Sequence, residues 1–268
     1  MALAPAFTGA GIAVPTPERE PVQGGLFTAS NVLPLPAHGE LGLFYETDGV
    51  YGVDQAVLDE NECLAMAQAL PEGYDFVHGV PVILHAAVEC FGFNANWQDF
   101  ADSARARLIA GEERALEQFA WTEIFPKLAK TEMPGSPLKA KRAVGRLQTV
   151  AGLMYTYVPT LHFGRDLAAD LADHFLVKFD EEKAAAIGGA RAANGAGYVD
   201  KTGPGAVEAT DAQEWLYITG QTTIWQSEID VHQAFDTTTN KMFAVAVRRD
   251  VIAIDGDFAA AARVTLDQ

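Results

Sequence analysis

The stretch WQDFADSARARLIAGEERALEQFAWTEIF, residues 97–125, is the clearest structural element of the chain. Its apolar residues recur at helical spacing and form one stripe. The stripe comprises Phe100, Ala104, Leu108, Ala115 and Phe119, and Leu116 and Ile124 widen it. The charged residues that lie mostly off the stripe are Arg105, Arg107, Glu112, Glu113, Arg114 and Glu117. The stretch therefore predicts a long helix with one apolar face, capped by Asn96 and ended by Pro126.

The segment before this helix divides into an arm and a pair of strand regions. Residues 1–37 are rich in proline, glycine and alanine, which keeps the backbone extended and leaves the segment unable to form a core of its own. We expect an arm that is either disordered or laid across a partner. Asp48-Gly49 in the stretch 38–58 predicts a hairpin, and residues 59–70 predict a short helix. Residues 74–91 predict one or two buried strands with a break at 79–81.

The region after the helix mixes helical and strand patterns. Residues 130–145 predict a linker, and the stretches 146–157 and 164–179 predict helix, or strand plus helix. In the second stretch, the apolar row is Leu167, Leu171 and Phe175. Residues 188–213 are rich in glycine and alanine and predict a long loop.

The C-terminal part has the patterns of strands. Residues 215–225 predict a strand interrupted at Gly220, and a turn follows at 235–240. Residues 241–247 alternate with period two, and 251–254 form a second short apolar run. The chain is therefore predicted to be α+β.

Composition and charge narrow the class of protein. The 268 residues are 49% hydrophobic, enough for one large domain or two small ones. There are 19 basic and 36 acidic residues, a net charge of −17, which disfavours binding to nucleic acid or to an anionic membrane surface. The chain has neither a signal-peptide pattern nor an apolar stretch of about 18 residues. We expect a soluble, cytoplasmic product with no membrane partner.

Two short patterns resemble functional motifs but fit poorly. The stretch GAGYVDKT, residues 195–202, nearly matches a phosphate-binding loop, yet Asp200 stands where a glycine belongs and its carboxylate would repel phosphate. A flexible surface loop is the better interpretation. Asp166, Asp170, Asp173 and His174 recur at helical spacing with His162 upstream, but we interpret them as a solvated helix face rather than a metal site.

Other candidate chemistry is equally weak. The six histidines are scattered, and the GxSxG elbow of serine hydrolases does not occur. Cys63 and Cys90 have no context of a nucleophile or a disulfide scaffold, so we expect buried free thiols. The four tryptophans, Trp97, Trp121, Trp215 and Trp225, are large apolar anchors of the core or of an interface, and the core is the safer interpretation for any one of them. The sequence thus predicts no catalytic, cofactor-binding or metal-binding residues, and no enzyme.

Four stretches together resemble a known family. They are VHGVPVILHAAVECFG (77–92), ARARLIAGEERALEQFAWTE (104–123), EWLYITGQTTIW (214–225) and AFDTTTNKMFAVAVRRDVIAID (234–255). The markers within them are Leu108, Gly111, Glu112, Arg114, Ala115, Glu117, Trp121, the run from Trp215 to Gly220, Asp236 and Asn240. Their order and spacing resemble major capsid proteins of actinobacterial tailed bacteriophages, which have the Hong Kong 97-type fold.

The resemblance implies a layout for the chain. Residues 1–37 would be the N-terminal arm, and 38–92 the extended loop with its flanking strands. Residues 93–145 and 229–268 would form a peripheral domain that contains the long spine helix. Residues 146–228 would form the axial domain.

The resemblance also implies a function. The chain would be a structural protein of the virion, made in the cytoplasm of a bacterial host, that assembles with itself into pentamers and hexamers of an icosahedral shell. Scaffold, portal and decoration proteins are further expected partners. The shell would enclose DNA without sequence-specific binding, which the acidic charge favours because adhesion would hinder packaging.

Two other classes remain open at this point. One is another virion component, or a compartment shell of the same fold, which would differ in what the particle encloses. The other is a small-molecule enzyme with a dispersed site, which would show a deep pocket with convergent polar groups.

Overall fold

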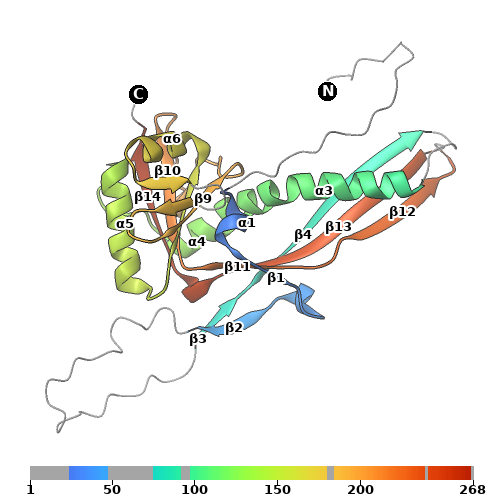
Figure 1. Ribbon diagram of the computed structural model, residues 1–268, viewed down its shortest axis with the longest axis horizontal. Coiled ribbons are helices and arrows are strands. Elements are labelled where there is room, and N and C mark those ends of the chain that lie inside the picture. The colour runs from blue at the N-terminus through green and yellow to red at the C-terminus, as the bar shows by residue number, and fades with distance from the viewer. Residues whose placement is uncertain (1–23, 48–74, 92–96, 180–183, 239–240, 267–268) are drawn as a thin grey trace, which may run out of the picture.

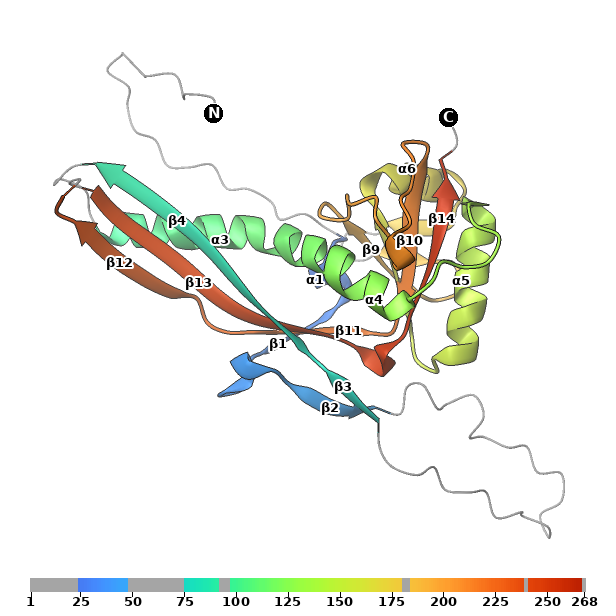
Figure 2. The same ribbon diagram turned by 180° about the vertical axis from the view of Figure 1, so that it is seen from behind.

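The computed structural model describes residues 24–47, 75–91, 97–179, 184–238 and 241–266. Its elements form two units (Figure 1). In the elongated unit, one long helix runs along a narrow twisted sheet. The compact unit is built on a second sheet at one end of that helix. Figure 2 shows the same division from behind, with the long strand β4 (Val80–Phe91) running diagonally across α3 (Trp97–Phe119).

The elongated unit is a five-stranded sheet covered by α3 (Trp97–Phe119). Its strands are β1 (Asn31–Pro34), β4 (Val80–Phe91), β11 (Thr222–Gln226), β12 (Asp230–Asp236) and β13 (Lys241–Ile254). The central strand β13 is antiparallel to β4 along one edge and to β12 and then β11 along the other. Strand β1 lies parallel to β11 at the outer edge.

A two-stranded ribbon projects from this unit. It pairs β2 (Phe44–Thr47) with β3 (Asp75–His78) in antiparallel register and leads through Gly79 into β4. A short 3-10 helix, η1 (Gly39–Leu41), precedes it. The predicted break at 79–81 is thus confirmed, but most of β4 is exposed or half-buried rather than buried. The partner of β2 is distant in sequence, and both the hairpin expected at Asp48-Gly49 and the helix expected at 59–70 involve residues outside the described ranges.

The compact unit contains a seven-stranded sheet in the order β5-β14-β10-β6-β9-β8-β7. These strands are β5 (Leu138–Lys139), β14 (Ala259–Thr265), β10 (Gln213–Thr219), β6 (Thr160–Gly164), β9 (Arg191–Gly195), β8 (Ala184–Ala186) and β7 (Val177–Phe179). Helices α5 (Ala140–Met154) and α6 (Arg165–Asp173) pack on it around Leu147, Leu161 and Leu216. The sheet also contains residues 138–139 and 259–265, and α5 begins at Ala140. In the layout expected from the resemblance, these residues fall in the stretches 93–145 and 229–268, apart from 146–228.

The chain crosses between the two sheets at two neighbouring points. One crossing is Gly220, between β10 and β11, and the other is η4 (Asp255–Asp257), between β13 and β14. The two points are in contact, because a Cβ added to Gly220 would overlap the carbonyl oxygen of Asp255. The interruption predicted at Gly220 is confirmed. The apolar stretch 215–225 divides there, and its two halves belong to different sheets. The runs 241–247 and 251–254, by contrast, belong to one continuous strand.

The long helix predicted over 97–125 is confirmed, with corrections. After α3 the chain continues through a π-helical turn, η2 (Ala120–Ile124), into α4 (Phe125–Ala129). Pro126 therefore does not end the helix but lies in the first turn of α4, where a missing N–H is tolerated. Ala115 is exposed and Leu116 is buried in its place. Asn96 lies outside the described residues.

Two further corrections concern the region after the helix. The loop predicted over 188–213 contains strand β9 and a short helix, η3 (Pro204–Ala206). In the apolar row of α6, Leu167 and Leu171 are buried, but Phe175 is 85% exposed because the helix has already ended at Asp173. Among the described residues, no helix is long and apolar enough to span a membrane.

Candidate functional site

The buried face of α3 carries two carboxylates at the junction of the two units. Glu112 and Glu117 are almost fully buried, although the charge pattern of the sequence predicted them off the apolar stripe. Between them, the side chain of Glu113 is partly buried. Each of the three accepts hydrogen bonds from another element. The helix is therefore fixed in place by its acidic residues as well as by its apolar ones.

Glu117 and Glu113 hold the short helix α1 (Leu26–Ala29) against α3. The backbone N–H of Leu26 donates to Oε1 of Glu117 at 3.1 Å, and that of Phe27 donates to Oε1 of Glu113 at 2.9 Å. Burial raises the pKa of both glutamates, and these backbone hydrogen bonds oppose the rise. Leu26 itself is fully buried. The helix α1, which follows residues 1–23 in the chain, is thus anchored on α3.

Glu117 also holds the glycine-rich loop 195–202. Its Oε2 accepts the N–H of Gly197 at 2.8 Å. A Cβ at Gly197 would lie 2.7 Å from the backbone nitrogen of Gln118, so only glycine allows this approach to α3. The indole of Trp121 stacks on Tyr198 and donates to the carbonyl oxygen of Asp200 at 2.9 Å. The expected flexible surface loop is therefore wrong at 195–200, which packs against the helix.

Glu112 belongs to a separate cluster between α3 and the sheet. Arg248 on β13 donates from Nη1 to both of its oxygens at 2.8 Å, and Gln226 on β11 donates from Nε2 to Oε1 at 2.8 Å. Asp250, two residues along β13, is fully buried beside them. These contacts link α3 to both β13 and β11 at the point where the helix crosses the sheet.

His162 lies in the core of the compact unit and not with the acidic row of α6. Its ring nitrogens contact the hydroxyls of Tyr198 at 3.1 Å and Thr219 at 2.9 Å. Burial lowers its pKa to about 3, so the ring is neutral. Asp166 and Asp173 are exposed, and Asp170 and His174 half-buried, on the outer side of α6. Among the described residues, no three His, Cys, Asp or Glu side chains come together as metal ligands.

The remaining candidates from the sequence fall into two groups. Trp121 and Trp215 are fully buried core residues as predicted, whereas Trp97 is 38% exposed and Trp225 half-buried. Cys90 lies on β4, and Cys63 lies outside the described residues.

The two-stranded ribbon has one packed face and one exposed face. On the packed face, Val77 is buried and the hydroxyl of Tyr45 reaches Asp255 at the crossing between the two sheets, which Tyr155 of the compact unit also contacts at 2.8 Å. Burial raises the pKa of both tyrosines above its ordinary value. The exposed face carries Phe44 and Phe76, whose rings contact edge to face. The ribbon is held at its base and presents aromatic side chains outward.

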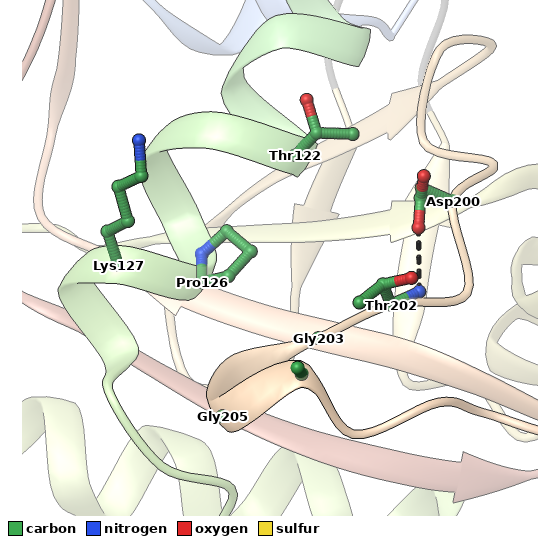
Figure 3. A pocket seen from close by; sticks show the side chains of 8 residues that line it. Thr122, Pro126, Lys127, Asp200, Thr202, Gly203 and Gly205 are labelled. Atoms are coloured by element: carbon green, nitrogen blue, oxygen red, sulfur yellow. Dashed lines mark hydrogen bonds between the residues drawn. The ribbon is translucent and has the colours of Figure 1, made fainter.

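An open pocket of about 310 Å³ lies between α4 and the loop that contains η3. Figure 3 shows its lining, where the Asp200 carboxylate accepts the N–H of Thr202 at 2.7 Å. Lys127, at its rim, is paired with Glu123. Its other lining residues are Thr122, Pro126, Gly203, Gly205 and Ala206. Neither His162 nor Asp250, two groups whose pKa values are strongly shifted, lines this pocket.

Comparison with known proteins gives a fold and no sequence family. No protein-family model and no curated protein matches the chain. Among solved structures, the capsid of the empty GTA particle aligns with a TM-score of 0.60 at 13% identity, covering 97% of this chain and 95% of that one. The capsid of the native GTA particle gives 0.55 at 13% identity, with 98% of each chain covered. The capsid of Ralstonia phage GP4 gives 0.50 at 9% identity, covering 100% and 98%. The likeness extends over essentially the whole chain.

Proposed function

We propose that this chain, which has the Hong Kong 97-type capsid fold, is the major structural subunit of a virion shell. The observation that carries the proposal is the length of the structural match. It covers 97% of this chain and 95% of a capsid subunit, and so includes the long helix and both sheets.

The exposed ribbon supports a role in assembly. The outer face of the ribbon exposes Phe44 and Phe76, whose rings are in contact, and further large apolar side chains are exposed at Leu41 of η1 and at Val80 and Ile83 of β4. Exposed large apolar side chains that contact one another are candidates for a protein interaction site. In the proposed shell, this region lies against another copy of the chain.

The two units fit the layout of such a subunit. We assign the elongated unit to the peripheral domain with α3 as its spine helix, and the compact unit to the axial domain. The axial domain then comprises residues 138–219 and 259–265, because their strands share one sheet. Residues 38–92 are assigned to the extended loop, with the ribbon at its base, and residues 1–37 to the arm, with α1 as its anchor.

The charge of the chain fits the proposed contents of the shell. A net charge of −17 disfavours adhesion to DNA, so the shell encloses DNA without binding a particular sequence. The proposed partners are further copies of the chain in pentamers and hexamers, together with scaffold, portal and decoration proteins. The proposed location is the virion, after synthesis in the cytoplasm of a bacterial host. A compartment shell of the same fold would enclose protein cargo instead.

Deletion of residues 1–23 tests the arm without removing its anchor. The cut leaves Leu26 and its hydrogen bond to Glu117 intact, so the thermal unfolding midpoint should change little. Gel filtration of the full-length chain should give shell-sized material, and the deletion should shift most of it to small oligomers. If neither chain forms large assemblies, alone or with scaffold protein, the proposed function is wrong. If both do, the arm assignment alone is wrong.

A further inference from the structure

The cluster at the crossing of α3 and β13 contains more negative than positive charge. Glu112 comes from α3, Arg248 and Asp250 come from β13, and Gln226 comes from β11. Arg248 and Gln226 both direct their hydrogen bonds to Glu112. One guanidinium therefore faces two carboxyl groups. With both carboxyl groups ionised, the cluster would bury an uncompensated negative charge.

Asp250 is the member of the cluster whose carboxylate oxygens form no hydrogen bond of ordinary geometry, although the Gln226 amide lies near enough to lower its pKa. It is fully buried, and neither of its carboxylate oxygens has a hydrogen-bond partner among the described residues. A buried carboxylate in that state pays the full cost of desolvation. A protonated carboxyl group avoids this cost, because its O–H is a donor and Glu112 beside it is an acceptor.

We propose that Asp250 holds a proton that it donates to the Glu112 carboxylate, and that release of this proton to solvent loosens the packing of α3 on the sheet. While the proton is held, Asp250 is a neutral acid that donates to the Glu112 carboxylate and so links β13 to α3. Once it is released, two negative carboxylates face each other where α3 crosses β13. The proposal concerns the folded subunit and does not depend on the proposed function.

The surroundings of Asp250 support this assignment. Burial and, next, the charge of Glu112 raise the pKa of Asp250 to about 7, against the opposing effects of Arg248 and of the Gln226 amide. The other elements add no further charge, since β11 contributes the neutral Gln226 and β4 places Val82 opposite Asp250. On β12, Asp230 is paired with Arg249 in an exposed ion pair.

The sign of the pH dependence follows from the raised pKa. Between about pH 4, the ordinary pKa of an aspartate, and about pH 7, the folded chain holds a proton that the unfolded chain has lost. Stability from this group is therefore complete at low pH and is lost as the pH rises through 7. His162, whose pKa is lowered, has the opposite dependence, so the contribution of Asp250 must be measured by difference.

The substitution Asp250→Asn provides that difference. Asparagine has the shape of the neutral acid and can also donate a hydrogen bond, but it does not titrate. Urea unfolding of the native chain and the variant should be compared between pH 5 and 8. We expect the unfolding equilibrium constant of the native chain, divided by that of the variant, to rise about tenfold per pH unit up to about pH 7 and then to level off. This slope corresponds to the loss of one proton on unfolding. A ratio independent of pH would overturn the proposal. So would a failure of the variant to fold.

Two further variants complete the test. In Glu112→Gln, Asp250 pairs with Arg248 alone. The stability of this variant should therefore lose the pH dependence of the native chain, as that of Asp250→Asn does. If Glu112→Gln keeps the pH dependence of the native chain, the Glu112 carboxylate does not hold the proton of Asp250 in place. The control Asp230→Asn removes an exposed carboxylate from the same sheet and should leave the dependence unchanged. Hydrogen exchange of the α3 peptide around Glu112, corrected for intrinsic rates, should be faster at pH 8 than at pH 6 only where Asp250 and Glu112 are both intact.

Discussion

At the scale of single residues, the sequence pattern of α3 predicts the position of the helix but not which of its charged side chains are buried. The apolar spacing located the helix, but Glu112 and Glu117 also lie on its buried face. Their partners are a backbone N–H at Gly197, one at Leu26, and the guanidinium of Arg248. These partners are distant in sequence, so nothing in residues 97–125 alone distinguishes a buried glutamate from a solvated one. A glycine at 197 was the available signal, although it was interpreted as a sign of a flexible loop.

Removal of the Glu117 carboxylate should destabilise the chain more than removal of an exposed one. In Glu117→Ala, two backbone N–H groups lose their acceptor, and the free energy of unfolding should fall by about 2–4 kcal/mol. The control Glu123→Ala breaks an exposed pair with Lys127 and should cost less than about 1 kcal/mol. Urea unfolding of both variants gives the comparison, and equal losses would mean that Glu117 is not an anchor.

Two glycines of the same region should respond to alanine in opposite directions. A methyl group at Gly197 would collide with the backbone of α3, so Gly197→Ala should destabilise by about 1–3 kcal/mol. At Gly111, inside α3, nothing lies within 4 Å of an added Cβ, and alanine should stabilise the helix by about 1 kcal/mol. Thermal unfolding midpoints should move down for the first variant and up for the second. Shifts of the same sign would contradict the described contact.

At the scale of elements, local patterns predicted which segments are strands, and distant contacts decided which sheet each joins. Residues 215–225 carried a strand pattern broken at Gly220, yet β10 and β11 belong to different sheets. At the point where β10 and β11 part, Gly220 contacts Asp255, which is 35 residues away in the chain. A local sequence pattern cannot predict such a contact. In the same way, β2 pairs with β3 across 27 intervening residues, so a hairpin interpretation of residues 38–58 could not find its partner.

The ribbon provides a prediction at this scale. Phe44 is 68% exposed on its outer face, so Phe44→Ser should change the free energy of unfolding of the subunit by less than about 1 kcal/mol. Assembly, measured by sedimentation velocity, should nevertheless be lost or strongly reduced. Val199→Ser, which changes a similarly exposed apolar residue in a loop of the compact unit, is the matched control and should assemble normally. Normal assembly of the Phe44 variant would exclude this face from the subunit contacts.

At the scale of the whole molecule, the two units share one junction. The anchor of α1 on α3, the crossings at Gly220 and Asp255, and the base of the ribbon all connect the elongated unit to the compact one. The sequence predicted the α+β class and the resemblance predicted the capsid fold, whereas the boundary between the units had to come from strand pairing. The strand β14 illustrates the reason, because its partner β10 lies 40 residues earlier in the chain.

The central claim is that copies of this chain close into a shell, and electron microscopy of the purified full-length chain tests it most directly. Negative-stain images, taken after gel filtration and with candidate scaffold protein added where needed, should show closed particles or rings of five and six subunits. A homogeneous monomer that stays monomeric on concentration and on addition of scaffold would contradict the account.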